Sequence, residues 1–370
     1  MAAPELYNFS PLLLLAALCL LLGAVPLGWI WFRHRHASPT VRLRALTLFT
    51  LFLTFDLVVF GAFTRLTDSG LGCPDWPGCY GSASPLGAHA DIHAAQTAMP
   101  TGPVTHGKAW VEMVHRYLAT VVGLLIIVLA VASWRVKQRG SAALSPWWAT
   151  ATLVWVCLQG AFGALTVTMK LYPAIVTMHL LGGLGLLVLL AIQSQAYERA
   201  PLSLSRGLRA AVWAVFALSA IQITLGGWVS TNYAVLACTD FPTCQGRWWP
   251  EMDFDHGFTV LRELGAGKDG GFLPFAALTA IHYTHRIGAV VVLGVMLLLA
   301  WRLYASREPA QRRWAAALIA VAAWQFASGL SNVVLGWPLV AALAHTAGAA
   351  ALITLLAVML ARARQAVPAS

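Results

Sequence analysis

Four histidines occupy related positions in the two halves of this chain, and their pattern suggests two sites for a metal-containing group. An ionisable side chain inside an apolar segment is costly and is therefore a candidate functional residue. A single buried histidine is commonly a hydrogen-bonded packing residue. Four of them at repeat-related positions point instead to ligation, and they are His115, His179, His285 and His345.

Helix geometry favours a haem over a bare metal ion at each pair. Each histidine lies a few residues into an apolar segment that begins on the same side of the membrane, which places it roughly 6–9 Å deep. Two imidazoles at one depth can face each other across a flat macrocycle inside a helix bundle. A copper or zinc site usually needs three or more ligands, with carboxylates or thiolates nearby. We therefore predict that His115 with His179, and His285 with His345, each hold one haem.

Glycines recur around these histidines. A Gln-x-x-x-Gly pattern occurs at Gln159/Gly163, Gln222/Gly226 and Gln325/Gly329, whereas the first helix has Leu57/Gly61. A His-x-x-Gly pattern occurs at His179/Gly182, His285/Gly288 and His345/Gly348, whereas His115 is followed by Leu118. We interpret the glycine three residues after three of these histidines as removing bulk where a porphyrin would lie. Packing of small residues between helices is the alternative.

One carboxylate distinguishes the first half from the second. Glu112 stands three residues before His115, on the same helical face, and its repeat counterpart is His282. Such a carboxylate can act as a general base or stabilise charge, or it can be an ordinary acid at a helix N-terminus. Asp56, in the middle of an apolar segment, is either a proton-path residue or a buried hydrogen-bonding group.

An arginine follows one histidine in each half. Arg116 and Arg286 are candidate contacts for haem propionates. The alternative is an arginine whose charged end reaches the membrane interface.

Two loops share the pattern C-x-D-(W/F)-P-x-C-x-G, with cysteines at 73 and 79 and at 238 and 244. Each pair is close in sequence and lies in a loop assigned to an oxidising compartment, so Cys73–Cys79 and Cys238–Cys244 disulfides are the simplest interpretation. Thiol redox work and transient metal transfer remain as alternatives.

The elements that carry these residues are membrane-spanning helices. The chain has 370 residues, 59% hydrophobic and 10% charged, far from the roughly 25% charged of soluble domains. Stretches of about 20 apolar residues, long enough to span a bilayer as helices, can be read near 11–32, 43–64, 112–134, 147–168, 174–196, 210–230, 279–301, 314–335 and 338–361. The chain is therefore predicted to be an all-α polytopic membrane protein. The bases behind its net charge of +10 form no tract, which argues against nucleic acid as a partner.

Basic residues predict the orientation. Most Lys and Arg residues fall in one set of short loops, which we assign to the cytoplasm. The cysteine loops, near 65–111 and 231–278, then face the outside, which is the periplasm for a protein of the bacterial inner membrane.

The repeats divide the chain into tandem units. Residues 43–196 and 210–361 each read as a four-helix haem domain, and an even number of helices per unit predicts a pseudo-twofold axis along the membrane normal. Residues 1–42 supply an extra transmembrane helix and a basic loop outside the repeat.

The sequence resembles the haem A synthase family. The resemblance rests on the run from Gly61 to Leu71, which reads GAFTRLTDSGL, on the Cys73–Cys79 motif, and on Glu112-x-x-His115-Arg116. The order and spacing of the other three histidines add to it. It covers about residues 43–361.

The resemblance implies an oxidoreductase that converts haem O into haem A, turning a porphyrin methyl into a formyl by successive hydroxylations, with haem B as cofactor. By position, His285 and His345 would hold haem B, His115 and His179 the substrate haem, and Glu112 would serve the chemistry. Cys73 and Cys79 would form a disulfide. Candidate partners are a haem O synthase, an electron acceptor and further copies of this chain.

Two other functions fit the same histidines. A di-haem cytochrome b would move electrons through two equivalent sites and give Glu112 no role. A haem transporter or chaperone would exchange its haem without forming a product.

The orientation predicts the labelling of introduced cysteines. In spheroplasts, a cysteine at Ser84 should react with a membrane-impermeant maleimide, whereas a cysteine at Ser141 should react only after lysis. The unmodified chain gives the background from its own thiols. Labelling at 141 in preference to 84 would reverse the orientation.

Overall fold

The computed structural model describes residues 10–138, 145–198, 200–268 and 271–365, and every element in these ranges is helical. Three residues that bear on the orientation lie outside the described residues: Ser141, which is one of the two labelling positions, and the basic residues Arg139 and Arg199 of the loops assigned to the cytoplasm. Nine of the described helices are long and apolar enough to cross a membrane, which confirms the predicted spans. They are α1 (Ser10–Arg33), α2 (Pro39–Leu66), α4 (His106–Gln138), α5 (Pro146–Thr168), α6 (Pro173–Ala196), α7 (Arg206–Thr231), α9 (Phe275–Tyr304), α10 (Pro309–Val334) and α11 (Leu339–Gln365).

Local sequence explains where many of these helices begin. Proline stands at the first turn of α2, α5, α6 and α10, where its missing N–H would have no helical partner. Ser38 and Ser205 cap α2 and α7 by accepting hydrogen bonds from the N–H groups of Val41 and Leu208.

Three short elements that the sequence did not predict lie in the connections: α3 (His89–Ala98), η1 (Ala234–Leu236) and α8 (Phe254–Gly257).

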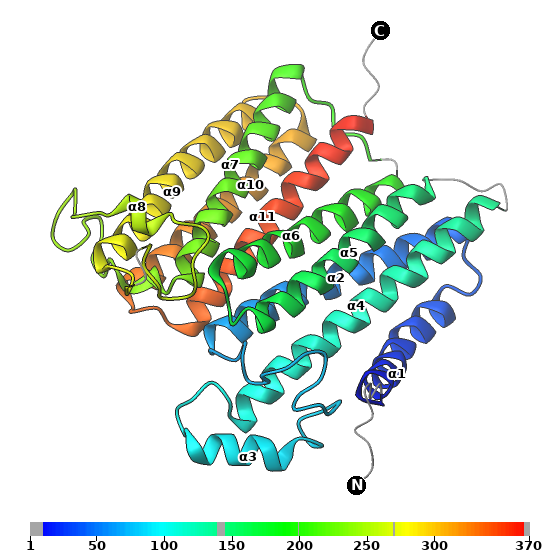
Figure 1. Cartoon of the computed structure of the whole chain (residues 1–370). Helices are drawn as coiled ribbons and strands as arrows, with labels where there is room; N and C mark the ends of the chain where they lie inside the picture. The colour runs from blue at the N-terminus through cyan, green and yellow to red at the C-terminus, as the bar shows by residue number, and fades with distance from the viewer. Residues whose placement is uncertain (1–9, 139–144, 199, 269–270, 366–370) are drawn as a thin grey trace. The chain divides into compact units, whose positions relative to one another are not determined.

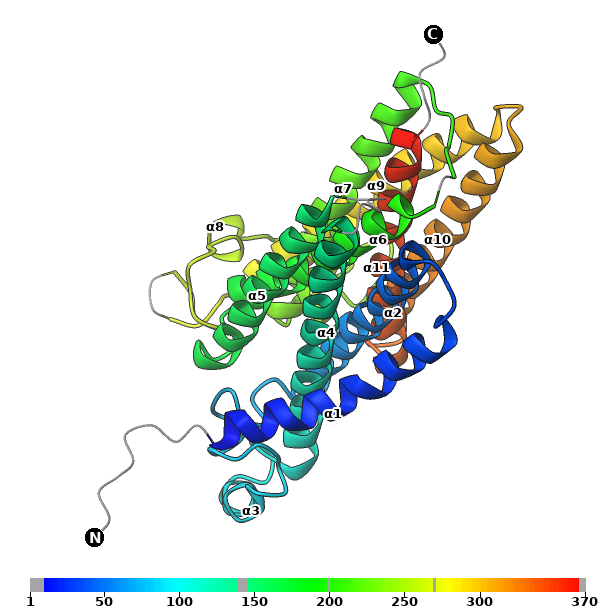
Figure 2. The same cartoon turned by 90° about the vertical axis from the view of Figure 1, so that its right-hand side faces the viewer.

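The contacts divide the chain into two compact units, Met1–Leu171 and Tyr172–Ser370, which are described separately. In the first unit α4 is central, and α1, α2, α3 and α5 all pack on it (Figure 1). The helix outside the repeat, α1, runs obliquely across α4 (Figure 2). Cys19 is buried there, with its sulfur 3.9 Å from the Tyr117 carbonyl oxygen.

In the second unit α7 packs on α9, α9 on α10, and α10 on α11, while α6 packs on both α7 and α11. One apolar core joins α7, α9, α10 and α11, with Met296, Leu318 and Leu356 almost completely buried. The compact units differ from the repeat units, since contacts group α6 with the helices that follow it. The repeat domains 43–196 and 210–361, and their pseudo-twofold, stay predictions.

The helix ends repeat at residue level. Past α2 and α7 the chain turns through one left-handed residue that is not glycine, Asp68 or Tyr233. Past α5 and α10 it turns through two left-handed residues, at 170–171 and 336–337. The same backbone turn therefore recurs where the repeat requires it.

Candidate functional site

Both cysteine loops fold in the same way, and an aspartate organises each. The pairs Cys73–Cys79 and Cys238–Cys244 are disulfide-bonded, as predicted. Asp75 accepts hydrogen bonds from the N–H groups of Tyr80 and Gly81, both at 2.7 Å. These two residues are left-handed, which explains the glycine of the motif.

The second loop repeats this turn around Asp240. Its carboxylate accepts from the N–H groups of Gln245 at 2.7 Å and Gly246 at 3.0 Å. Hydrogen bonds, first from the Thr243 hydroxyl and then from these backbone groups, lower the pKa of Asp240 to about 2. The carboxylate therefore stays ionised, and the turn should hold, until the pH falls to about that value.

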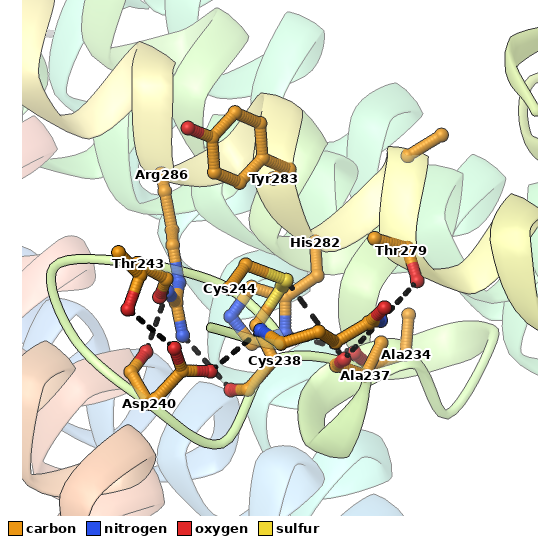
Figure 3. Close-up of a disulfide and its surroundings, with 12 residues drawn as sticks. Ala234, Ala237, Cys238, Asp240, Thr243, Cys244, Thr279, His282, Tyr283 and Arg286 are labelled. Carbon is orange, nitrogen blue, oxygen red and sulfur yellow. Dashed lines mark hydrogen bonds between the residues drawn. A yellow bond between two sulfur atoms is a disulfide. The ribbon is translucent and has the colours of Figure 1, made fainter. Parts of the chain in front are cut away.

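The arginines that follow His115 and His285 each hold the cysteine loop of their own half in place. Arg116 donates to the Asp75 carbonyl at 2.8 Å and to the Gly78 carbonyl. Arg286 donates to the equivalent Asp240 and Thr243 carbonyls, both at 2.8 Å, and to the Cys238 carbonyl (Figure 3). The sequence did not predict these contacts. A propionate contact stays a prediction, and the buried Nε of Arg286, which has no hydrogen-bond partner among the described residues, is a donor available for it.

Glu112 is buried, and the first loop holds it. One carboxylate oxygen accepts from the Cys73 N–H at 2.8 Å, and the other pairs with Arg116. The side chain is therefore fixed one helical turn from His115. The repeat counterpart, His282, is also buried, with its Nδ1 2.9 Å from the Ala234 carbonyl (Figure 3 shows His282 beside Cys244). Equivalent positions of the repeat thus carry a carboxylate in the first half and, in the second half, an imidazole that is hydrogen-bonded to the backbone.

His285 of α9 and His345 of α11 lie close together. Their ring centres are 6.4 Å apart, with the ring planes at 89°. Imidazole nitrogen binds a metal at about 2.0–2.1 Å. Since a ring centre lies about 1.1 Å behind its nitrogen, two imidazoles on opposite faces of one iron would have centres about 6.3 Å apart. The observed separation therefore fits a bis-imidazole haem. Among the described residues, no group of three or more His, Cys, Asp or Glu side chains could hold a metal ion.

A glycine of a neighbouring helix lies against each ring. A β-carbon added at Gly226 would lie 2.9 Å from Cε1 of His285, and one at Gly329 would lie 3.1 Å from Cε1 of His345. In the first unit, a β-carbon at Gly61 would lie 3.0 Å from Cε1 of His115. Gly61, Gly226 and Gly329 are thus the surfaces against which the three imidazoles lie.

The glutamine of the same pattern binds the ring nitrogen. The Gln222 amide nitrogen lies 2.9 Å from Nδ1 of His285 and 2.9 Å from its carbonyl oxygen. Oriented to satisfy its surroundings, the Gln325 amide likewise donates to Nδ1 of His345 at 2.9 Å and to its carbonyl at 3.2 Å. A neutral imidazole that binds a metal through Nε2 carries its proton on Nδ1, and the amide would then have to turn its oxygen toward Nδ1.

This glutamine corrects the interpretation of the His-x-x-Gly pattern. A β-carbon at Gly288 would lie 2.2 Å from Oε1 of Gln222, and one at Gly348 would meet Trp324 at 2.6 Å and Gln325 at 3.2 Å. These two glycines make room for side chains of the neighbouring helix. This contact favours the alternative stated for the pattern, which is close packing of neighbouring helices at small residues.

The remaining predicted ligands lie in different compact units. His115, in α4, stacks on Phe60 of α2 with ring centres 6.2 Å apart and planes at 14°. His179 lies in α6. Their pairing around one haem stays a prediction, and so does a role for Asp56 of α2.

Comparison with known proteins identifies the family. The family model COX15-CtaA, described as "Cytochrome oxidase assembly protein", matches residues 44–357. A heme A synthase of Shewanella oneidensis is 37% identical over 318 residues, which cover 85% of this chain and 94% of that protein. Heme A synthases of Alkalihalophilus pseudofirmus (28% over 303 residues, 79% and 87% covered) and Paracoccus denitrificans (27% over 357, 89% of each) are also similar. The chain, whose described part contains nine apolar helices and two disulfide loops, belongs to the COX15-CtaA family of cytochrome oxidase assembly proteins.

Proposed function

We propose that the chain oxidises haem O to haem A, converting a porphyrin methyl into a formyl by successive hydroxylations. The similar proteins named heme A synthase support this reaction. The observation that carries it is the inequality of the two halves. One half has a buried carboxylate held one turn from a histidine, and the other has His282 in that place.

His285 and His345 hold haem B as the resident cofactor. Their 6.4 Å ring separation supports this assignment. When bound, haem B supplies the redox chemistry. The protein positions the ligands: Gly226 and Gly329 set where each ring rests, and the two glutamines engage each Nδ1.

His115 and His179 hold the substrate haem, and Glu112 serves the reaction beside it. Family resemblance supports the pairing of the two histidines. Glu112 acts as a proton acceptor or stabilises charge near the reacting methyl group. The Cys73 N–H and the Arg116 guanidinium hold the carboxylate in place, so little reorganisation is needed when charge develops.

The cysteine loops face the outside of the cell membrane. The excess of basic residues in the opposite loops and the two disulfides support this orientation. A haem O synthase, an electron acceptor and further copies of the chain are candidate partners by family resemblance.

An electron-transfer cytochrome with two equivalent haems would not need this asymmetry. Extraction of the pigments from the purified protein separates the two functions. Haem B together with haem O or haem A supports the synthase, whereas haem B alone would favour the cytochrome.

Removing either cofactor ligand should abolish the low-spin bis-imidazole spectrum of haem B. His285→Ala and His345→Ala each leave the iron with one imidazole, whereas His282→Ala removes only a ring bound to the Ala234 carbonyl. Absorption and EPR spectra of the purified variants measure this. Loss of the haem from His282→Ala, with retention in His285→Ala, would show that the ligand assignment is wrong.

Crowding the glycine beside a ligand should displace that ligand. Gly226→Val adds a β-carbon that would lie 2.9 Å from the His285 ring and should lower the haem B content and broaden the low-spin signal. Gly294→Val is the matched control, because it lies in the same helix as His285, is exposed and has nothing within 4 Å of an added β-carbon. Equal spectra from the two variants would contradict the proposed contact.

Substitution of Glu112 should stall the reaction and keep the cofactor. A positioned carboxylate contributes typically 10²–10⁴-fold to proton transfer, so Glu112→Ala and Glu112→Gln should lower haem A formation by about that factor. Haem O or a partly oxidised haem should accumulate while the haem B spectrum persists. Glu112→Gln retains an oxygen that can accept from Cys73, and therefore separates the charge from the loop contact. Chromatography of the extracted haems measures this. If both variants formed as much haem A as the wild type, Glu112 would have no role in the reaction beyond that of an acid near a helix N-terminus.

A further inference from the structure

A basic pocket lies in the second unit where α10 begins and α11 ends, on the side assigned to the cytoplasm. Its volume is about 470 Å³, and Arg313 and Arg362 line it. Arg313 is the fifth residue of α10, and Arg362 is the fourth from the end of α11. Because α10 has 26 residues and a length of about 39 Å, its ends extend beyond the roughly 30 Å hydrocarbon core of a bilayer. Both arginines therefore lie at the depth of lipid headgroups.

Apolar side chains form the rest of the wall. Pro201 and Leu202 contribute from the connection between α6 and α7, and Trp314 contributes from α10. Among the described residues, no carboxylate lines the pocket. Two cations beside apolar walls suit a ligand that has an anionic group next to an apolar body.

The connection between α6 and α7 is fixed against the helix ends, beside the end of α11 (Figure 1). The Ala200 N–H donates to Oε1 of Gln365 at 3.0 Å, and the Gln311 amide donates to the Ser203 carbonyl at 2.8 Å. The wall that this connection supplies is therefore tied to both α11 and α10. A pocket whose walls are already fixed loses little conformational freedom when it binds a ligand.

Arg362 is held at one end of its guanidinium and free at the other. Its Nε donates to Oε1 of Gln195, near the end of α6, at 2.7 Å. Its backbone carbonyl accepts from the Leu202 N–H at 3.1 Å, so the same residue also holds a wall of the pocket. Its two Nη groups have no hydrogen-bond partner among the described residues. The side chain is thus oriented, and its strongest donors remain available to a ligand.

Arg313 is exposed and forms no hydrogen bond or ion pair with any described residue. The pocket therefore has two guanidinium groups whose charge no carboxylate balances. Like charges that line one pocket repel each other, and an anion between them removes that repulsion. Guanidinium groups bind the oxygens of a phosphate through paired, charge-assisted hydrogen bonds.

We propose that this pocket binds the phosphate group of an anionic phospholipid from the membrane leaflet on the same side. Arg313 and Arg362 contact the phosphate, and Trp314, Pro201 and Leu202 contact the glycerol and the upper acyl chains. Free phosphate offers the same oxygens, but the apolar walls and the depth at the membrane surface favour a lipid. Basic pockets between transmembrane helices on the cytoplasmic side bind such headgroups. The site is separate from the haem chemistry proposed above.

The test measures which lipids the purified full-length protein retains, by native mass spectrometry after exchange into micelles with equal amounts of phosphatidylglycerol and phosphatidylcholine. The wild type should retain phosphatidylglycerol in preference. Arg313→Gln combined with Arg362→Gln should lower that preference by about 25-fold, because each basic residue near a membrane surface strengthens the binding of anionic lipid by about 5-fold. A wild type without this preference would overturn the proposal.

Arg312→Gln combined with Arg364→Gln is the matched control. It removes the same charge from the same two helices, but neither residue lines the pocket. Arg312 donates to the Ser306 carbonyl at 3.1 Å, and the Arg364 guanidinium lies 5.9 Å from the centre of the Trp213 ring. The control should keep the preference for phosphatidylglycerol. An equal loss in both double variants would mean that a diffuse positive surface attracts the lipid, and it would refute the pocket.

Ala310→Glu keeps the proposal falsifiable if the arginine variants fold poorly. Ala310 lines the pocket in the first turn of α10, where the helix dipole favours an acid. The added carboxylate would occupy the guanidinium groups without removing them. Retention of phosphatidylglycerol should fall as in the Arg313 and Arg362 pair, and retention equal to that of the wild type would count against the site.

Inorganic phosphate distinguishes the two sources of the anion. A ligand that binds only the folded state raises the midpoint of thermal unfolding. Phosphatidylglycerol should raise the midpoint of the wild type more than that of the Arg313 and Arg362 double variant. Sodium phosphate at the same concentration, compared with sodium chloride at equal ionic strength, should not raise it. An equal rise from phosphate would show a site for the free ion and overturn the assignment to a lipid.

Discussion

The close approach of an imidazole to a glycine on a neighbouring helix is the contact on which the rest of this structure depends. It occurs at Gly61 with His115, Gly226 with His285 and Gly329 with His345, and in each case an added β-carbon would lie within about 3 Å of the ring. A side chain at these glycines would push the ring away. Helix packing and the placement of the histidine are therefore coupled. The two helices can come this close only where a glycine leaves room for the imidazole ring.

A second constraint couples the outer loops to the helices. A disulfide and an aspartate close each loop over a short stretch of chain, so each loop is a stiff unit. The arginine that follows His115 or His285 donates to three carbonyls of that unit. In the first half the same loop also holds Glu112 through the Cys73 N–H. The proposed reaction uses the Glu112 carboxylate. The position of this carboxylate depends on the first cysteine loop, which the Cys73–Cys79 disulfide closes.

The two halves share a scaffold and differ at a few positions. The loop turns, the arginine clamps, the left-handed helix ends and the glycine–imidazole contacts recur. The differences concentrate around the histidines: Glu112 against His282, Leu57 against Gln222, and Leu118 against Gly288. Such changes keep the shared contacts and alter what surrounds each histidine, as the proposed division into a cofactor site and a substrate site requires.

Features that depend on short stretches of chain could be predicted from the sequence. The nine spans follow from hydropathy, because a bilayer requires about 20 apolar residues, and both disulfides follow from cysteines six residues apart. The repeat motifs singled out four histidines, and the structure brings two of them, His285 and His345, close together. The tertiary structure decided which atoms meet: Gln222 with Nδ1 of His285, Arg116 with the Asp75 carbonyl, and the glycine at 288 with an amide in place of a porphyrin. These partners lie about 40 to 65 residues apart on different elements. Their meeting depends on helix packing and side-chain direction, which no local pattern of residue types encodes.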